Sequence, residues 1–523
     1  MTDGVGRAVI VYIIDGMKSN IEKSKCLSVL GTGSDVGKSI VVTALCRIFS
    51  DMGFEVAPYK AQNMSNNSYI TKEGLEIGRA QVVQAQAARV EPLADMNPVL
   101  LKPSSDTGAQ VVLRGKAIGN CLAKDYFANT DFLAGKALES LNRLREDYKL
   151  IVMEGAGSCA EINLLERDYV NFRMAREAGA PVILVADIDR GGVFAQIIGT
   201  LNILPPEYAS MVKGIIVNRF RGDASLFDDG IKYIEQKTGL PVLGVIPHFY
   251  HIEIDAEDGM PIETLIDPAF GPVGDKVNIA CLRLPHISNF TDFNPLIRHK
   301  RVNFHYLSKP RELHGYDLLI LPGSKNTRFD IKWLSEAGWL EKIRRFDGEK
   351  GRILGVCGGY QMMGLSIEDP EGIEGDPGAT PGLGMLNVRT VLHNEKLTTC
   401  TTGKWPDLDH ATVTGYEIHM GRTSPCGSGR PVLHLESSNG LPIDEPDGWQ
   451  CDGGRLMGVY LHGLFDEPRL RQRFLDKLCP NLGLSEDDDY QISLGQFRDR
   501  QYNLLAEHFR THLNMGRLME ILG

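Results

Sequence analysis

The sequence lacks the features that mark several specialised classes of protein. Its 523 residues contain no uninterrupted run of about 18 apolar residues, so no membrane-spanning helix is expected. The ten cysteines include no Cys-x-x-Cys pair, so neither a zinc site nor a dithiol redox motif is indicated. Acidic residues outnumber basic ones by 67 to 56, and the net charge of −11 argues against a general surface for nucleic acid or acidic membranes.

A secretory signal is not expected either. The one short apolar run near the N-terminus, 8–14, follows Asp3, ends before Asp15 and has no small-residue cleavage site behind it. The scattered cysteines are then expected to be buried thiols in a reducing compartment. We therefore expect a cytoplasmic protein without a membrane or nucleic-acid partner.

Glycine is the residue that the sequence has in excess. It accounts for 56 of the 523 residues, with no collagen-like period, and average proteins contain about 7% glycine. In a globular chain such a surplus indicates tight turns and places where the backbone approaches a ligand closely. The motifs below contain many of these glycines.

Short β-branched runs alternate with helical stretches along the chain, which is typical of parallel sheets covered by helices on both faces. One helix is expected from Lys38 to about Met52. The predicted strands of a first series are 27–30, 56–59, 150–153, 182–185, 214–217 and 242–245. Those of a second series are 277–284, 318–321, 353–356 and 456–460.

These two series divide the chain into parts, as its length also suggests. Segment 248–276 is acidic, contains several Pro and Gly and has weak periodicity, so it is predicted to be a linker. Segment 369–384, rich in Gly and Pro, is predicted to be a surface loop. The expected parts are an N-terminal extension 1–25, an α/β domain 26–247, the linker 248–276, a second α/β domain 277–480 and a C-terminal helical tail 481–523.

One glycine-rich segment lies between the first predicted strand and the first helix. It reads Gly31, Thr32, Gly33, Ser34, Asp35, Val36, Gly37, Lys38 and Ser39. Backbone N–H groups at the turn can surround phosphate, Lys38 can reach the outer phosphates, and Ser39 can bind Mg²⁺. The segment therefore predicts ATP and Mg²⁺ as ligands. Five residues separate Gly31 from Gly37 instead of the usual four, and this longer form resembles the loop of dethiobiotin synthetase-like ATPases.

Other strand ends of the first domain carry polar residues that fit a nucleotide site. Glu154 ends a buried strand, where its carboxylate could hold Mg²⁺. Lys60 ends another strand and could contact phosphate or a reacting carboxylate, and a plain surface lysine is nearly as good an interpretation. Segment 187–192 could hold metal, order the substrate or serve only the structure. The resemblance to dethiobiotin synthetase-like ATPases implies that Asn218 contacts the adenine edge and that Pro247 lies near the base.

A second motif lies in the second domain, where the apolar run 353–356 leads into Cys357-Gly358-Gly359. This is the cysteine version of a nucleophile elbow, because small neighbours permit a sharp strand-to-helix turn that exposes the thiol at a helix N-terminus. The N–H group of Gly358 would face the developing oxyanion. Gly323, at another strand-end turn, could supply a second donor.

A thiol nucleophile needs a base, and 13 histidines compete for that role. His462 is favoured, because it ends the predicted strand 456–460 and the same sheet edge can bring it to Cys357. His419 is the rival, and we expect it to have a structural or substrate-facing role.

Together the two motifs resemble class I glutamine amidotransferase chemistry joined to an ATP-dependent amide ligase. The chain resembles the cobyric acid synthase family, the glutamine-hydrolysing enzymes of cobalamin biosynthesis. The resemblance covers about 27–474 and depends on the further stretches 60–64, 76–81, 97–103, 287–293 and 322–327. It implies an α/β fold with an N-terminal P-loop domain, containing a dethiobiotin synthetase-like parallel sheet, and a C-terminal class I glutamine amidotransferase domain.

The same resemblance implies a substrate. It implies ATP- and glutamine-dependent amidation of the b, d, e and g carboxylates of adenosylcobyrinic acid a,c-diamide to give adenosylcobyric acid. The partners would then be the small molecules glutamine, ATP and a corrinoid polycarboxylate. Cobyrinic acid a,c-diamide synthase, which shares this architecture, is the close alternative, and stretches 60–64 and 289–293 favour the first family.

Two more distant interpretations fit less well. A partitioning-type ATPase switch would begin its loop with Lys-Gly-Gly and would not carry a glutaminase domain. A glutaminase with an inactive ligase half is disfavoured by the intact Lys38, Ser39 and Glu154.

One departure from the common glutaminase pattern leaves the orientation of the base open. Class I enzymes of this kind usually follow the catalytic His with Pro-Glu, whereas Gly463 and Leu464 follow His462 here. The third member of a triad is therefore missing from its usual position. Asp466, four residues on, and a backbone carbonyl are both candidates for the group that orients the imidazole.

Overall fold

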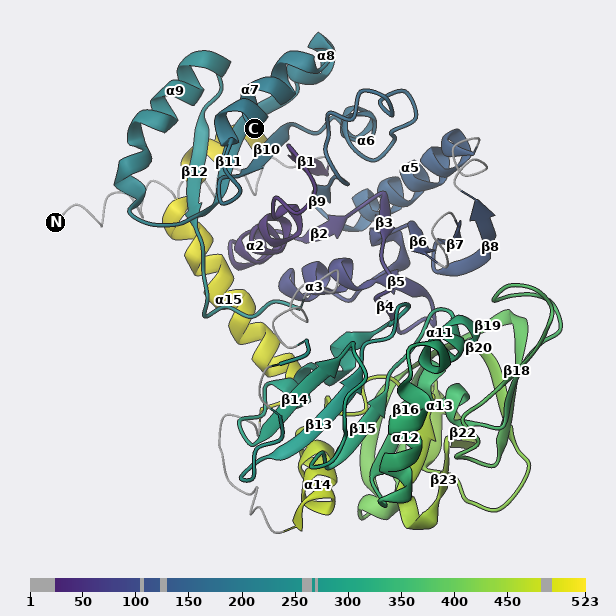
Figure 1. Cartoon of the computed structure of the whole chain (residues 1–523). Helices are drawn as coiled ribbons and strands as arrows, with labels where there is room; N and C mark the ends of the chain where they lie inside the picture. The colour runs from purple at the N-terminus through teal and green to yellow at the C-terminus, as the bar shows by residue number, and fades with distance from the viewer. Residues whose placement is uncertain (1–23, 104–107, 123–128, 256–265, 269–270, 481–491) are drawn as a thin grey trace.

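Two α/β lobes, one above the other in Figure 1, make up the chain. The computed structural model describes residues 24–103, 108–122, 129–255, 266–268, 271–480 and 492–523. The N-terminal extension 1–25 therefore lies almost wholly outside the described residues. The long helix α15 (Leu494–His512), yellow in Figure 1, runs from the second lobe back along the first.

The first lobe is built on a six-stranded parallel sheet in the order β12-β11-β10-β1-β9-β2. Its strands are β1 (Lys25–Gly31), β2 (Val56–Tyr59), β9 (Leu150–Glu154), β10 (Val182–Asp187), β11 (Val212–Phe220) and β12 (Val242–Pro247). Each of the six strands predicted in the first series lies within one of them. The sheet is sandwiched between helices and its central strands are buried, which explains why their sequences are continuous apolar runs.

Helices connect these strands and cover the sheet. They are α2 (Lys38–Asp51), α3 (Arg79–Ala87), α5 (Thr130–Asp147), α6 (Phe172–Ala178), α7 (Val193–Ile203), α8 (Pro206–Ala209) and α9 (Asp228–Thr238). The predicted helix 38–52 is therefore confirmed. The C-terminal helices α15 and α16 (Met515–Leu522) pack their apolar residues into the same core as α2.

The second lobe has its own sheet in the order β14-β13-β15-β16-β24-β23, parallel except for β23. The strands are β13 (Val277–Leu282), β14 (Val302–Leu307), β15 (Leu318–Leu321), β16 (Arg352–Val356), β23 (Trp449–Cys451) and β24 (Leu456–Val459). All four predicted strands of the second series are present. The helices are α10 (Asn294–Ile297), α11 (Thr327–Glu336), α12 (Trp339–Gly348), α13 (Gly358–Met363) and α14 (Pro468–Leu478).

Three antiparallel or mixed sheets were not predicted. The largest is built around the long hairpin β19 (Val388–Trp405) and β20 (Ala411–Pro425). It also contains β17 (Ser366–Asp369), β18 (Gly378–Pro381), β21 (Leu433–Ser438) and β22 (Leu441–Asp447). The first lobe adds β3 (Gln62–Met64), β6 (Val99–Pro103), β7 (Gly108–Leu113) and β8 (Lys116–Leu122), with β4 (Ser68–Ile70) paired to β5 (Glu76–Gly78).

The predicted surface loop 369–384 is only partly a loop. Its residues Gly378–Pro381 form β18, which pairs with β17 in antiparallel register. The turn between them is fixed by the buried Asp369, whose carboxylate accepts hydrogen bonds from the backbone N–H groups of Ile373 (2.8 Å) and Glu374 (2.9 Å). The glycine and proline content correctly indicated a turn, but it gave no indication of the strand β18.

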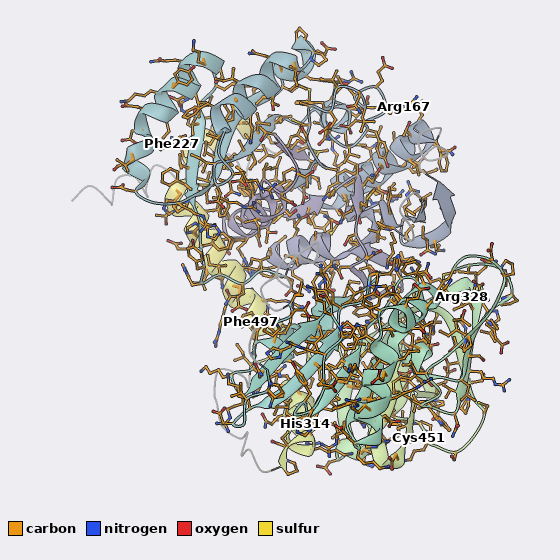
Figure 2. The ribbon with its side chains drawn as sticks, viewed as in Figure 1. Arg167, Phe227, His314, Arg328, Cys451 and Phe497 are labelled. Atoms are coloured by element: carbon orange, nitrogen blue, oxygen red, sulfur yellow. The ribbon has the colours of Figure 1, made fainter. Side chains whose placement is uncertain are left out.

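Asp255, in the described first part of the segment predicted as a linker, contacts both lobes. The carboxylate of Asp255 is buried and binds Arg79 (3.1 Å) from the first lobe, Arg298 (3.3 Å) from the second and Arg498 (2.7 Å) on α15. Burial alone would raise the pKa of Asp255, but the three guanidinium groups hold it far below its usual value. Phe497, labelled in Figure 2, packs beside this cluster with the Arg298 guanidinium 4.3 Å from its ring.

The lengths and compositions of the helices show whether any of them could cross a membrane. Across the part of the chain that the structure describes, none combines the length and the apolar run that crossing a bilayer requires.

The Asp255 cluster makes the first testable prediction. Asp255→Asn should destabilise the protein by about 3–5 kcal/mol, because three buried guanidinium groups lose the carboxylate that compensates them. Thermal unfolding and limited proteolysis should detect the loss. Asp229→Asn is the matched control, since Asp229 makes an ion pair with Lys232 on an exposed helix face and its side chain is 93% exposed. Equal melting temperatures for both variants would show that the Asp255 cluster does not hold the lobes together.

Candidate functional site

Cys357 lies at the turn between β16 and α13, where the sequence predicts a nucleophile elbow. Its backbone has φ 52° and ψ −108°, a conformation that a non-glycine residue rarely adopts. The glycines beside it are required by close packing, because a Cβ on Gly359 would lie 1.8 Å from the carbonyl oxygen of Leu321. The strained turn places the thiol at the start of a helix, on the rim of a cavity of about 350 Å³.

His462 is held rigidly beside Cys357. Its ring stacks on Tyr416 with centroids 5.1 Å apart, and the two residues exchange backbone hydrogen bonds of 2.8 and 3.2 Å. Its Nδ1 lies 2.6 Å from Oδ2 of Asp292, and the N–H group of Gly463 donates to the other oxygen of that carboxylate (3.3 Å). The ring is therefore fixed with Nε2 left for the proton that the thiol must lose.

Electrostatics favour the charged imidazolium at this position. Burial alone would lower the pKa of His462, but the neighbouring Asp292 carboxylate and Cys357 sulfur raise it to about 10. A positively charged ring next to a thiol stabilises the thiolate, which is the nucleophilic form of cysteine. The geometry therefore suits a Cys-His-Asp triad.

Asp292 is the functional residue that the sequence interpretation missed. The sequence offered Asp466 or a backbone carbonyl as the group that orients the imidazole of His462. Neither one binds Nδ1 of the ring, because the carboxylate of Asp292 does. The sequence contains a partial indication of this role, because Asp292 lies in segment 287–293, one of the stretches on which the family resemblance depends. It is 170 residues from His462 in sequence, so spacing could not connect the two.

The two predicted oxyanion donors lie next to this triad. A Cβ built on Gly323 would be 3.4 Å from Cε1 of His462, and one built on Gly358 would be 2.8 Å from the backbone nitrogen of Ser324. Gly323 and Gly358 therefore lie side by side at the ends of β15 and β16. Their role as oxyanion donors is consistent with this position and remains a proposal.

His419 is not part of the triad. Its Nδ1 donates to the carbonyl oxygen of Gly421 (2.7 Å), and its ring stacks on Tyr460 with centroids 3.6 Å apart. It lines the same cavity as Cys357, together with Gln361, whose side chain binds Thr327 (3.1 Å) and Tyr460 (3.2 Å). This placement fits the structural or substrate-facing role expected for His419.

The phosphate loop of the first lobe is closed around its own lysine. Gly37 has φ 95°, and Nζ of Lys38 donates to the carbonyl oxygens of Gly33 (2.9 Å) and Gly157 (2.7 Å). Asn218 donates its side-chain N–H to the carbonyl oxygen of Val36 (2.9 Å), which braces the loop. Lys38 is thus aimed across the loop, where phosphate oxygens would replace these carbonyls.

Glu154 forms the centre of a small polar network below the loop. Its carboxylate accepts hydrogen bonds from the hydroxyl of Ser39 (2.9 Å), from Nζ of Lys60 (2.8 Å) and from the side chain of Gln84, which the sequence interpretation missed. Lys60 is 5% exposed, so the surface-lysine interpretation is wrong. The structure brings Ser39, Lys60 and Glu154, each predicted separately for the nucleotide site, into contact with one another.

This network fits a bound Mg²⁺. Ser39 and Glu154 offer a hydroxyl and a carboxylate oxygen, the hard ligands that Mg²⁺ prefers. No cluster of three or more His, Cys, Asp or Glu side chains with metal-binding geometry occurs within the described ranges. Such a sparse protein contribution is typical of an ion that keeps several waters and bridges substrate phosphates.

The remaining predicted nucleotide residues surround the loop more loosely. Asp35 lies 3.6 Å from Arg190 in an exposed ion pair, and the N–H group of Thr32 donates to Val185 (3.0 Å) instead of facing phosphate. In segment 187–192, Asp187 binds Arg219 (2.9 Å). The carbonyl oxygen of Pro247 accepts a hydrogen bond from His508 on α15 (2.9 Å). Their contacts with a nucleotide remain proposals.

The first lobe also contacts the neighbours of the catalytic histidine. The N–H group of Ser68 on β4 donates to the side-chain oxygen of Asn289 (3.1 Å), and the carbonyl oxygen of Ser68 accepts from the hydroxyl of Tyr416 (3.2 Å). The amide nitrogen of Asn289 in turn lies 3.5 Å from Nε2 of His462. One strand of the first lobe therefore touches two residues that position the base.

Comparison with known proteins gives two family matches that divide the chain as the lobes do. Residues 27–262 match the CobQ/CobB/MinD/ParA nucleotide binding domain. Residues 278–470 match the CobB/CobQ-like glutamine amidotransferase domain.

Similar proteins match over almost the whole length. A cobyric acid synthase of Chlorobium phaeobacteroides (strain BS1) is 54% identical over 497 residues, covering 95% of this chain and 99% of the relative. That of Chlorobaculum tepidum is also 54% identical, covering 95% and 98%. That of Syntrophobacter fumaroxidans is 44% identical over 522 residues, covering 96% and 99%.

The triad makes a prediction about pH. The imidazolium of His462 exists below its pKa of about 10 and is lost as the pH rises through that value. Asp292→Asn removes the carboxylate that raises the pKa of His462. The basic limb of the pH profile for glutamine hydrolysis should therefore move to lower pH. The turnover number should fall by roughly 100- to 10,000-fold.

The control for this prediction is Asp466→Asn, which removes the neighbouring carboxylate that does not bind the ring. It should retain the basic limb of the unmodified protein. An Asp292→Asn profile that coincides with that of the unmodified protein would exclude Asp292 from the triad.

Proposed function

Since the chain belongs to the cobyric acid synthase family, we propose that its two lobes perform the two halves of one amidation in cobalamin biosynthesis. The chain is a glutamine-hydrolysing amidotransferase with a nucleotide-binding domain. One observation supports the assignment of one half-reaction to each lobe. The same chain contains a buried Cys-His-Asp arrangement in one lobe and a phosphate loop with its Ser39–Glu154 pair in the other.

In the second lobe, Cys357 attacks the side-chain amide of glutamine. The thiolate sulfur adds to the carbonyl carbon, and the N–H groups of Gly323 and Gly358 stabilise the oxyanion. His462 gives its proton to the leaving nitrogen, so ammonia departs and a thioester remains. His462 then takes a proton from water, which attacks the thioester and releases glutamate and Cys357.

In the first lobe, a carboxylate of the substrate attacks the γ-phosphorus of ATP. Lys38 and the N–H groups of the loop spread the charge of the phosphoryl group in transit. Ser39 and Glu154 would hold Mg²⁺, which when bound neutralises phosphate oxygens. The products are ADP and an acyl phosphate, and ammonia displaces phosphate from the acyl carbon to form the amide.

The two halves need a sheltered connection, because free ammonia is mostly protonated at neutral pH and the acyl phosphate hydrolyses in water. The cavity at Cys357 supports such a connection. Its lining includes Lys102, Gly108 and Gln110 from β6 and β7 of the first lobe as well as residues of the second. Ammonia released at Cys357 would therefore emerge in a cavity that both lobes line.

The substrate that we propose is adenosylcobyrinic acid a,c-diamide, amidated at its b, d, e and g carboxylates with one ATP and one glutamine for each. The corrin ring holds the cobalt, so the protein needs no histidine ligand for it. The relatives described above are cobyric acid synthases, which favours this substrate over that of cobyrinic acid a,c-diamide synthase. We place the enzyme in the cytoplasm, with small molecules as its partners.

The separation of the two sites is tested by Cys357→Ala. This variant should lose glutamine-dependent amidation completely, because no other thiol lies on the elbow. Amidation supported by ammonium chloride should continue, since ATP activation uses the other lobe. A folded variant that loses both activities would contradict separate sites.

The substrate assignment is tested by mass spectrometry of the corrinoid product. Incubation of the enzyme with ATP, Mg²⁺, glutamine and the a,c-diamide should convert all four remaining carboxylates to amides, through partly amidated products. A parallel incubation with cobyrinic acid should leave its a and c carboxylates unchanged. Turnover of cobyrinic acid alone would show that the enzyme is the a,c-diamide synthase.

A further inference from the structure

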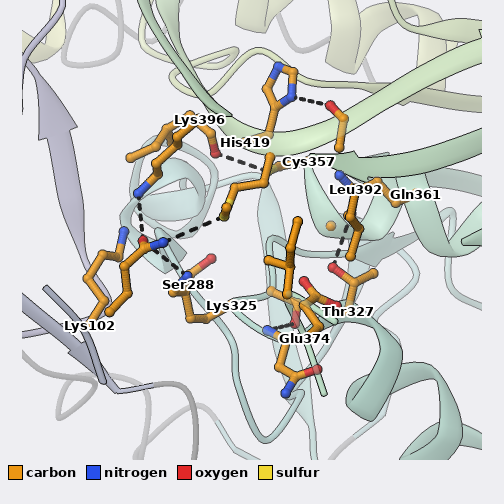
Figure 3. A pocket seen from close by; sticks show the side chains of 18 of the residues that line it. Lys102, Ser288, Lys325, Thr327, Cys357, Gln361, Glu374, Leu392, Lys396 and His419 are labelled. Carbon is orange, nitrogen blue, oxygen red and sulfur yellow. Dashed lines mark hydrogen bonds between the residues drawn. The ribbon is translucent and has the colours of Figure 1, made fainter. Parts of the chain in front are cut away.

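The cavity at Cys357 contains charged side chains that the proposed chemistry does not use. Figure 3 shows Lys102, Lys325, Lys396 and Glu374 around the same space as Cys357. Hydrolysis of an amide by a thiol requires none of these charges. A charged lining in a partly enclosed cavity is costly unless it meets a charged ligand.

Two of the three lysines already have an anionic partner. Nζ of Lys102 and Nζ of Lys396 bind the two oxygens of the buried Glu76 carboxylate, at 2.8 and 2.6 Å. One carboxylate thus serves two amino groups at the boundary between the lobes. Burial lowers the pKa of Lys396 to about 7 although Glu76 opposes this, so this part of the lining carries only a partial excess of positive charge near neutral pH.

Lys325 has no such partner. Its Nζ binds the neutral side-chain oxygen of Gln110, at 3.3 Å, and no carboxylate of the described residues lies within 4.0 Å of it. Burial and the nearby Lys102 lower the pKa of Lys325 to about 8. Lys325 lies four residues after the end of β15 and lines the same cavity as Cys357.

Glu374 supplies the opposite charge from another part of the lining. Its carboxylate accepts a hydrogen bond from the backbone N–H group of Arg328 (2.9 Å), while the guanidinium of Arg328 binds Asp369 (2.9 Å) instead. Within the described part of the chain Glu374 makes no ion pair. Burial raises the pKa of Glu374, and the backbone donors and the charge of Lys325 oppose this effect.

An unpaired cation and an unpaired carboxylate in one cavity match a zwitterion. We propose that Lys325 binds the α-carboxylate and Glu374 the α-ammonium of glutamine, whose side-chain amide then reaches Cys357. The inference rests on the proposed glutaminase role of this cavity. It assigns to these two residues the recognition of a free amino acid, in preference to other primary amides.

The link from Lys325 to the ligase lobe is part of this arrangement. The oxygen of Gln110 on β7 accepts hydrogen bonds from both Lys325 (3.3 Å) and Lys396 (3.2 Å). A residue of the first lobe therefore orients the lysine that receives the α-carboxylate. The glutamine site is complete only when the two lobes are together.

The test compares glutamine with two analogues that each lack one of its α-groups. Glutaramate has no α-ammonium group, and 4-aminobutanamide has no α-carboxylate. Lys325→Met should lower kcat/KM for glutamine by about 10- to 100-fold, the usual value of a charge-assisted hydrogen bond, and leave 4-aminobutanamide almost unaffected. Glu374→Gln should lower kcat/KM for glutamine similarly and leave glutaramate almost unaffected.

The matched control is Lys332→Met, which removes an exposed lysine of α11 in the same lobe and should not change any of the three substrates. If Lys325→Met does not fold, Lys325→Gln and Lys325→Arg replace it. Lys325→Arg should keep the preference for free glutamine over 4-aminobutanamide. Lys325→Gln should lose that preference.

Two results would overturn the assignment. One is an equal loss for glutamine and for the analogue that lacks the matching group, because this indicates general distortion of the cavity. The other is an unchanged KM for glutamine in both variants. Failure of the glutaminase assignment would look different, since the unmodified protein would then release no glutamate from glutamine.

Discussion

The hydrogen bond between Asp292 and His462 is the contact on which the glutaminase half depends. It fixes the imidazole with one nitrogen toward the thiol and keeps the ring positively charged well above neutral pH. Both groups are buried, so their opposite charges compensate for the solvation that each has lost. The sheet brings the two together: His462 follows β24, and Asp292 lies in the short helical turn Phe290–Phe293 that comes after β13.

The same turn connects the triad to the ligase lobe. Asn289 begins it in the left-handed conformation (φ 51°), binds Ser68 of β4 and reaches toward Nε2 of His462. Tyr416, which stacks on His462, also binds Ser68. Any shift of β4 must therefore move two neighbours of the base. Hydrogen bonds from the lobe in which ammonia is needed therefore hold two neighbours of His462.

Much of the fold could be predicted from the sequence, and parts of each site could not. Continuous apolar runs are a strong signal for buried parallel strands, so all six strands of the first lobe's parallel sheet and four of the six in the second lobe's were predicted, β1 and β16 among them. The motifs at Lys38 and Cys357 are local, and their backbone geometry depends on adjacent glycines. Asp292 and Gln84 were missed because their partners lie far away in sequence. The long hairpin β19–β20 was missed because it contains no continuous apolar run: its strands alternate exposed and buried residues and are joined by the turn at Pro406–Leu408. The cluster at Asp255 was misjudged for a related reason, since an acidic residue among Pro and Gly looks solvent-exposed until three distant arginines are placed around it.

The distribution of charge explains how an acidic chain can bind anionic substrates. A net charge of −11 would repel the proposed anionic substrates if it acted at the sites. The proposed sites nevertheless contain Lys38 and Lys60 in the first lobe and Lys325 in the second, in partly dehydrated surroundings where screening is weak, although Glu154 compensates Lys60. Several of the acidic residues lie elsewhere, on exposed helix faces such as that of Asp229 or compensated within the protein, as at Asp255. Affinity for anions should therefore depend on a few local groups, and substituting a surface carboxylate remote from the phosphate loop and from the cavity at Cys357 should leave the binding of ATP and of glutamine unchanged.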